Sequence, residues 1–269
     1  AELLPYLGIP ASALQETSVP SLDELAAVGR ADEALDRNDL WQAWQEVEGR
    51  LQPMAMRLRT ELLERVQQPG APAVDRARIL AAAGDGEAAW GLIAAQVEGG
   101  AQERSAEPRV LVAAAEVQLA RRDPARARSF AESALRLRAE DPDALVALGR
   151  ALELAGDHAG AQAALERAAR AAPKSLRPVE QLAAVTEATP AVGARSLLAL
   201  ATLQAERLEP ERAARSLARA VALDPKVAGD AARLRGRLAT RMGRSEESQS
   251  AYEEALRTGG SHDPETLVG

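Results

Sequence analysis

Apolar residues recur at helical spacing along most of the chain, and residues 142–175 show the pattern best. Leu145, Leu148 and Leu152 follow three- and four-residue steps, which places their side chains on one face of an α-helix. The same spacing returns after a break at Gly156, a residue suited to a left-handed helix end. This segment therefore predicts two successive amphipathic helices joined by a glycine turn.

The pattern of this segment returns at a nearly fixed stride. Its small and apolar positions recur 34 residues earlier, 52 residues later and a further 35 residues on. Such a period is typical of a repeat architecture, and the longer step leaves room for one extra helix and its turn. The predicted helical hairpins occupy residues 108–141, 142–175, 194–227 and 229–262, with the extra helix at 175–188.

Upstream of residue 99 the pattern is weaker but still helical. We interpret residues 21–98 as divergent hairpins, at 21–51 and 73–97, with a single helix between them. The other expected parts are an extended N-terminal segment at 1–20, a linker at 99–107 that could serve as a hinge, the array at 108–262, and a flexible tail at 263–269.

The stretch ALVALGRALELAGDHAGAQAALERAARAAP, residues 144–173, resembles a tetratricopeptide repeat. Residues 194–227 fit nearly as well, whereas 108–141 and 229–262 fit less closely. The resemblance implies an all-α fold, a right-handed α-solenoid of antiparallel helix hairpins with single inserted helices. The matching residues of the best repeat are Leu145, Leu148, Gly149, Leu152, Ala161, Leu165, Ala168 and Pro173.

Stacked hairpins complete one another's cores and curve into a superhelix with a concave face. In tetratricopeptide proteins the first helix of each pair lines that face, so the resemblance implies that its polar residues contact a partner. The arginines expected there are Arg109, Arg150, Arg195, Arg233, Arg237 and Arg241. Other groove candidates are Glu116, Asp143, Glu153, Thr202 and Glu206.

Arg233, Arg237 and Arg241 are four residues apart and so share one helical stripe. Two interpretations stay open for them. The stripe could bind carboxylates or phosphates of a partner, or it could be a solvated face paired with glutamates of the next helix. The lysine and asparagine pattern with which chaperone-associated family members hold a terminal carboxylate is not evident.

Composition argues against an enzyme. The chain has no Cys and two His, His158 and His262, which excludes a thiolate nucleophile and argues against a zinc site. The paired glycines at 99–100 and 259–260 lack the Lys and hydroxyl residue of a nucleotide-binding loop. We therefore expect no catalytic residue, no metal and no cofactor.

Few aromatic residues are available for packing. Trp41 and Trp44 are three residues apart and either fill gaps in the core or form an exposed anchor for a partner. Trp90 is expected to fill the core in the same way. Phe130 and Tyr252 fall on apolar stripes and are expected in the core.

Charge and hydropathy limit the expected partners. The chain carries 33 basic and 40 acidic side chains, a net charge of −7, which argues against nucleic acid. No uncharged apolar run reaches the length of a membrane helix. We expect a non-catalytic scaffold that binds another protein or peptide, within a bacterial assembly because alanine and arginine dominate.

Several alternatives stay open at this point. The groove could instead take an acidic polymer, either a polysaccharide or a nucleic acid, in envelope export or regulation. The expected compartment is either the cytoplasm or the periplasm and cell envelope. The end of the last hairpin has no evident cap, which leaves an end-to-end homodimer open.

Overall fold

The computed structural model describes residues 20–68, 70–97 and 107–258, and these ranges contain helices and turns without a strand. The expected N-terminal segment, linker and tail lie almost wholly outside the described residues. The helices are α1 (Leu22–Asp36), α2 (Leu40–Val47), α3 (Pro53–Arg65), α4 (Ala73–Ala82), α5 (Gly86–Val97), α7 (Pro108–Ala120), α8 (Pro124–Leu137), α9 (Pro142–Leu154), α10 (His158–Ala171), α11 (Leu176–Thr186), α12 (Pro190–Glu206), α13 (Pro210–Leu223), α14 (Ala228–Arg241) and α15 (Ser245–Arg257).

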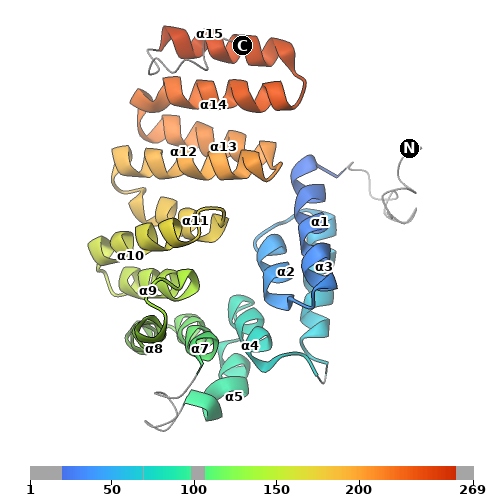
Figure 1. The fold of residues 1–269 in the computed structure, drawn as a ribbon, viewed down its shortest axis with the longest axis vertical. Coiled ribbons are helices and arrows are strands. Elements are labelled where there is room, and N and C mark those ends of the chain that lie inside the picture. The colour runs from blue at the N-terminus through green and yellow to red at the C-terminus, as the bar shows by residue number, and fades with distance from the viewer. Residues whose placement is uncertain (1–19, 69, 98–106, 259–269) are drawn as a thin grey trace, which may run out of the picture.

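Neighbouring helices pack as hairpins along the chain (Figure 1), which confirms the predicted all-α solenoid. The pairs are α1 with α2, α4 with α5, α7 with α8, α9 with α10, α12 with α13 and α14 with α15. The single helix α3 connects two hairpins. The other inserted helix, α11, packs against both α10 and the long helix α12.

Aspartates begin several second helices by accepting backbone hydrogen bonds. The Asp123 carboxylate accepts from the N–H of Arg126 at 3.0 Å, and Asp157 accepts from Gly160 at 2.9 Å. Each cap satisfies a backbone donor that the first helical turn leaves free. The preceding residue is left-handed in both turns, Arg122 with φ 62° and Gly156 with φ 84°. These local choices fix where each hairpin turns.

Within the best repeat, Gly149 lets two helices approach closely. A Cβ atom at this position would lie 2.7 Å from Cγ of Leu165 and 3.3 Å from the carbonyl oxygen of Ala161. Leu165 is fully buried and cannot easily move aside. The small residue therefore sets the distance between α9 and α10.

Gly149→Ala is expected to lower the free energy of unfolding by about 1–3 kcal/mol, because the added methyl overpacks this interface. The matched control is Gly29→Ala in α1, where nothing lies within 4 Å of the added atom. That variant should gain about 0.5–1 kcal/mol from its lower backbone entropy. Urea denaturation measures both, and a stabilised Gly149→Ala variant would contradict the close approach.

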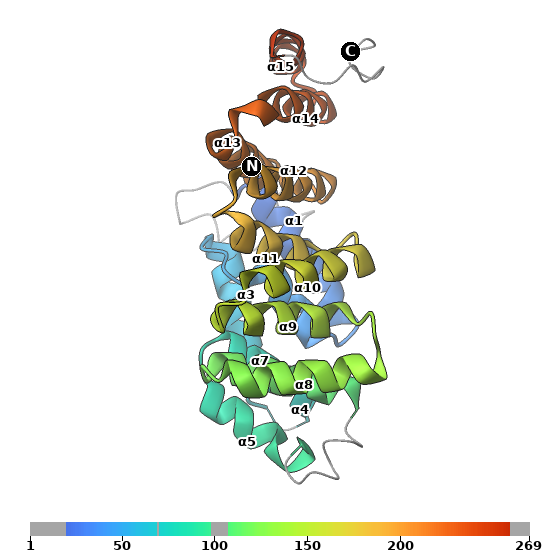
Figure 2. The same cartoon turned by 90° about the vertical axis from the view of Figure 1, so that its left-hand side faces the viewer.

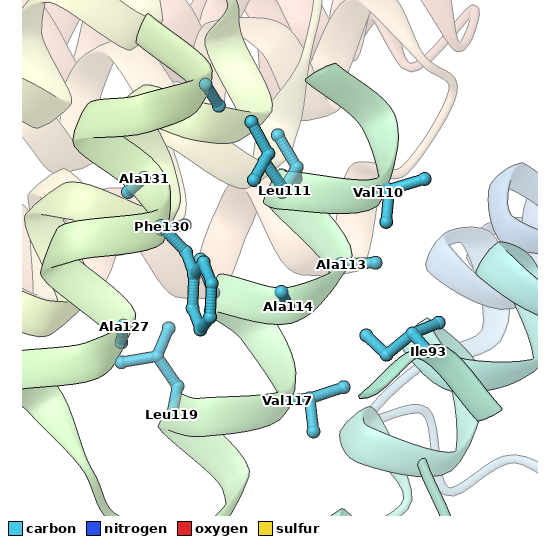
Figure 3. Packing of buried hydrophobic residues seen from close by; sticks show 14 of the residues in the cluster. Ile93, Val110, Leu111, Ala113, Ala114, Val117, Leu119, Ala127, Phe130 and Ala131 are labelled. Atoms are coloured by element: carbon cyan, nitrogen blue, oxygen red, sulfur yellow. The ribbon is translucent and has the colours of Figure 1, made fainter. Parts of the chain in front are cut away.

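The N-terminal hairpins and the C-terminal array share one core across the expected hinge. Ile93 of α5 packs in the same cluster as Val110, Leu111 and Val117 of α7 (Figure 3), and the cluster continues to Phe130 of α8. All five side chains are at most 7% exposed. A hinge motion at the linker would therefore have to open this apolar packing.

The aromatic residues mostly lie inside. Trp41 and Trp44 are 6% and 3% exposed, so they are not an exposed anchor. Phe130 is buried, and its ring centroid lies 6.1 Å from that of the half-buried Trp90. Tyr252 is also half-buried, and its ring packs so closely against Gly236 of α14 that a Cβ atom added there would touch it.

The solenoid bends back on itself, which the repeat pattern does not predict. Helices α1–α3, which we call the N-terminal arm, lie beside a second arm formed by α9–α13 (Figure 1). Figure 2 shows the two arms one behind the other. α1 contacts α13, although most of the chain separates them in sequence.

Candidate binding channel

A cavity of about 760 Å³ lies between the two arms, and we call it the channel. Its wall comes from α2, α4, α7, α9 and α11 together with the turn between α12 and α13. Nine basic and six acidic residues line it, and two buried acids behind the lining, Glu116 and Glu209, pair with five of the basic residues. The nine basic residues are Arg50, Arg78, Arg109, Arg138, Arg150, Lys174, Arg177, Arg207 and Arg212.

One group of ion pairs, behind the lining of the channel, surrounds the buried Glu116 of α7. Its carboxylate accepts from Nε of Arg78 at 2.5 Å and from Nη2 of Arg177 at 2.7 Å. Arg78 also donates to Asp143 at 2.8 Å. We call these four residues the Glu116 cluster, and it ties α4, α7, α9 and α11 together.

The pKa of Glu116 lies at about 2, well below its usual range. Burial alone would raise it, but the guanidinium groups of Arg78 and Arg177 outweigh that effect. The charge on Glu116 is therefore stabilised at every physiological pH.

Trp41 of α2 supports the same two arginines. The Cζ atom of Arg78 lies 4.0 Å from the centroid of the indole ring, and that of Arg177 lies 5.1 Å from it. Cations at such distances are attracted by the electrons of the ring face. Trp41 thus links the N-terminal arm to the charged wall of the channel.

A second group of ion pairs joins the tip of the N-terminal arm to the turn between α12 and α13. The wholly buried Glu209 is held by Arg30, by Nη2 of Arg50 at 2.9 Å and by Nη1 of Arg212 at 2.8 Å. Nε of Arg207 lies 3.7 Å from the same carboxylate. Four guanidinium groups thus surround one buried carboxylate.

Two acidic residues of the N-terminal arm complete this contact from the other side. Glu46 of α2 accepts from Nε of Arg30 at 2.9 Å and from Nη2 of Arg207 at 2.5 Å. Asp23 of α1 accepts from the backbone N–H groups of Glu211 at 3.0 Å and Arg212 at 2.7 Å. We call the whole set the closing contact: Asp23, Arg30, Glu46 and Arg50 on one arm, Arg207, Glu209 and Arg212 on the other.

Asp23 caps the first turn of α13 from a distant part of the chain. Its two acceptor atoms satisfy N–H groups that the helix start leaves without a partner. The side chain is wholly buried, and this burial raises its pKa to about 6 in spite of the two hydrogen bonds. An N-terminal residue of α1 therefore ends up inside the molecule.

The structure brings two of the six expected arginines into the channel. Arg109 and Arg150 line it, whereas Arg195 is exposed on α12 outside its wall. The stripe on α14 also lies outside the wall. There Arg233 pairs with Asp230, and both Arg237 and Arg241 are exposed.

Arg150 differs from the other arginines of the wall. Within the described ranges no carboxylate lies at ion-pair distance from it, although the group is half-buried in α9. Burial and the neighbouring Arg177 lower its pKa from the ordinary arginine value. Even so, an arginine stays protonated at neutral pH. Its guanidinium is therefore charged and lies in the wall of the channel.

The sequence predicted Glu116 and Asp143 as groove residues but indicated neither of their partners, Arg78 and Arg177. Arg78 and Arg177 lie in a divergent hairpin and an inserted helix, where no repeat register indicates which face is concave. One signal did exist for Glu209. It precedes a proline at a helix start where other hairpins carry aspartate, and glutamate is not a preferred cap.

The part of the chain that the structure describes contains neither a membrane-spanning helix nor a cluster of metal ligands. None of its helices combines the length and the apolar character that crossing a membrane requires. Nor do its acidic and histidine side chains gather in any group of three or more that could hold a metal ion.

The family model of the tetratricopeptide repeat matches residues 118–185, from the end of α7 to α11. This match includes the best of the predicted hairpins and confirms the resemblance there. A comparison with curated proteins gives no match.

Solved structures with similar folds include tetratricopeptide proteins. A Parabacteroides merdae tetratricopeptide repeat protein is 15% identical over 92% of this chain and 97% of its own, with a TM-score of 0.39. MamA is 16% identical over 69% and 93%, with a TM-score of 0.37. YrrB, described as having an unusual peptide-binding site, is 19% identical over 78% and 95%, with a TM-score of 0.34. These scores are low, so the fold assignment rests on the helix pairs themselves.

Proposed function

We propose that this tetratricopeptide-repeat chain is a non-catalytic scaffold that binds a segment of another protein in the channel. The observation that carries the proposal is the channel itself, a partly open cavity between the two arms that is lined by charged side chains. Most of these side chains are held by ion pairs within the wall, as in the Glu116 cluster. A wall ordered before binding loses little conformational entropy when a ligand arrives.

Arg150 is the residue best placed to recognise that segment. It lines the channel, it lies on the first helix of the best repeat, and no carboxylate of the described chain lies at ion-pair distance from it, although Glu48, Glu116 and Glu153 are close enough to attract it. A guanidinium can bind a carboxylate through two parallel hydrogen bonds. We therefore propose that Arg150 contacts an acidic side chain of the bound segment.

The alternative binding surface is the stripe on α14 formed by Arg233, Arg237 and Arg241. Charge reversal distinguishes this stripe from Arg150 in the channel. A partner captured from the native host should bind Arg150→Glu at least about tenfold more weakly, about 1.4 kcal/mol, because like charges then face each other. Arg237→Glu reverses a charge outside the channel and should leave the affinity unchanged. The measurement is isothermal titration calorimetry of the purified pair, with circular dichroism to confirm helicity.

The opposite pattern would move the binding site to α14. If both variants bind the partner as tightly as the unmodified protein does, neither surface is the binding site. An acidic polymer is the alternative ligand, and the basic residues of the channel wall would be its contacts. For a polymer, binding should weaken steeply with salt, because each neutralised phosphate or carboxylate releases counterions. A shallow salt dependence supports a protein segment.

A further inference from the structure

We infer that the closing contact is a gate, which opens to admit the partner segment into the channel from the side. The inference rests on the proposed function, because it describes how the same channel is reached. It is carried by the polar character of the closing contact and by the separate cores of the two arms.

The closing contact has no apolar core. One apolar cluster holds α1–α4, with Trp44 and Leu62 at its centre, and another holds α12–α14 around Leu217. No cluster formed by the described residues contains side chains from both α1–α2 and α12–α13. Burial of apolar surface, the main stabilising effect in folding, therefore contributes little to keeping the arms together.

Buried charges hold the contact instead, and such contacts are finely balanced. The attraction between Glu209 and its arginines is offset by the loss of water from every charged group. The closed form also leaves Nη1 of Arg50 and Nε of Arg207 buried without a hydrogen-bond partner. Water would satisfy both atoms once the arms separate. Open and closed forms can thus differ by a small free energy, which a two-state device requires.

Opening does not require either arm to unfold. The N-terminal arm stays joined to the array through the apolar cluster that α4 and α5 share with α7. Leu62 and Ile79 pack in the separate cluster of α1–α4, away from the closing contact. The motion can therefore occur between two folded bodies.

The gate and the channel share side chains. Glu46 and Arg50 from one arm, with Arg207 and Arg212 from the other, belong to the closing contact and also line the channel. Separation of the arms widens the channel and frees these charges at the same time. A partner segment inside a longer chain could then enter sideways, without threading an end.

The test measures the distance between the arms in solution. The chain has no cysteine, so Glu33→Cys in α1 and Ala218→Cys in α13, both exposed, give two unique sites for spin labels. Pulsed electron resonance reports the distance between them. Ala163→Cys in α10 with Ala218→Cys is the control pair, because both residues lie in the same arm.

Glu209→Gln is expected to open the gate, because it removes the charge of the one carboxylate that all four guanidinium groups of the closing contact approach. The distance between arms should lengthen and broaden while the control pair keeps its distance. If the control pair also changes, Asp23→Asn decides, since it weakens the same contact by removing the charge that caps α13. An unchanged distance between arms in both variants would overturn the gate.

Access to the channel is measured without any partner. Ser175 lines the channel, is half-buried and makes no side-chain cap. The thiol of Ser175→Cys should react severalfold faster with a polyethylene glycol maleimide when Glu209→Gln is also present. An equal rate would contradict gating. Because neither readout uses the partner, a failure here leaves the proposed scaffold function to be judged by its own binding experiment.

Discussion

Glu116→Gln is expected to lower the free energy of unfolding by about 3–5 kcal/mol, the cost of leaving buried charges without their partner. Arg78 is 5% exposed and the side chain of Arg177 is 17% exposed, so water can replace the lost carboxylate only in part. Asp143 would be the one remaining acid of the Glu116 cluster, and its side chain is 36% exposed. The two guanidinium groups would then repel each other across Trp41.

The matched control is Glu132→Gln. Glu132 pairs with Arg128 one turn away on α8, and both side chains are well exposed. A surface pair of this kind contributes at most about 1 kcal/mol. Urea denaturation measures both variants, and equal losses would show that the Glu116 cluster is no more important than a surface pair.

Acid is expected to remove the same stabilisation in the unmodified protein. The pKa of Glu116 is about 2 in the folded chain and 4.5 ordinarily. A group with a depressed folded pKa stabilises the fold fully above its ordinary pKa and loses that contribution as the pH falls towards the folded pKa. The loss between pH 4.5 and 2 should reach about 3 kcal/mol, at 1.36 kcal/mol for each pKa unit.

The difference between the unmodified protein and Glu116→Gln isolates this contribution from other carboxylates. Thermal denaturation from pH 7 to pH 2 should show the two stabilities converging below pH 4.5, because protonated Glu116 resembles glutamine. Parallel curves across this range would contradict the depressed pKa. The basic neighbours Arg78 and Arg177 stay charged throughout.

The hairpins were predictable because their signals are local. In residues 142–175 the apolar spacing, the turn at Gly156 and the small residue Gly149 all act within one repeat. The register of that repeat also placed Arg150 on the concave face, where the structure has it in the channel. Each of these features depends on neighbours at most about one hairpin away.

The closure of the solenoid was not predictable because it depends on distant parts of the chain. Arg30 and Glu209 are 179 residues apart, and they meet only through the summed rotation of every hairpin between them. The acid that caps α13, Asp23, stands in the first turn of α1. An acidic residue there is favoured by the helix dipole alone, so its position gave no sign of a long-range role.

Small-angle X-ray scattering of the whole chain tests most directly whether the two arms meet with a channel between them. We expect the scattering of a molecule whose N-terminal arm lies against α12 and α13, with a greater maximum dimension in Glu209→Gln. An unmodified chain that scatters as an open, extended superhelix, with the same dimensions as this variant, would contradict the contact between the two arms and the channel between them.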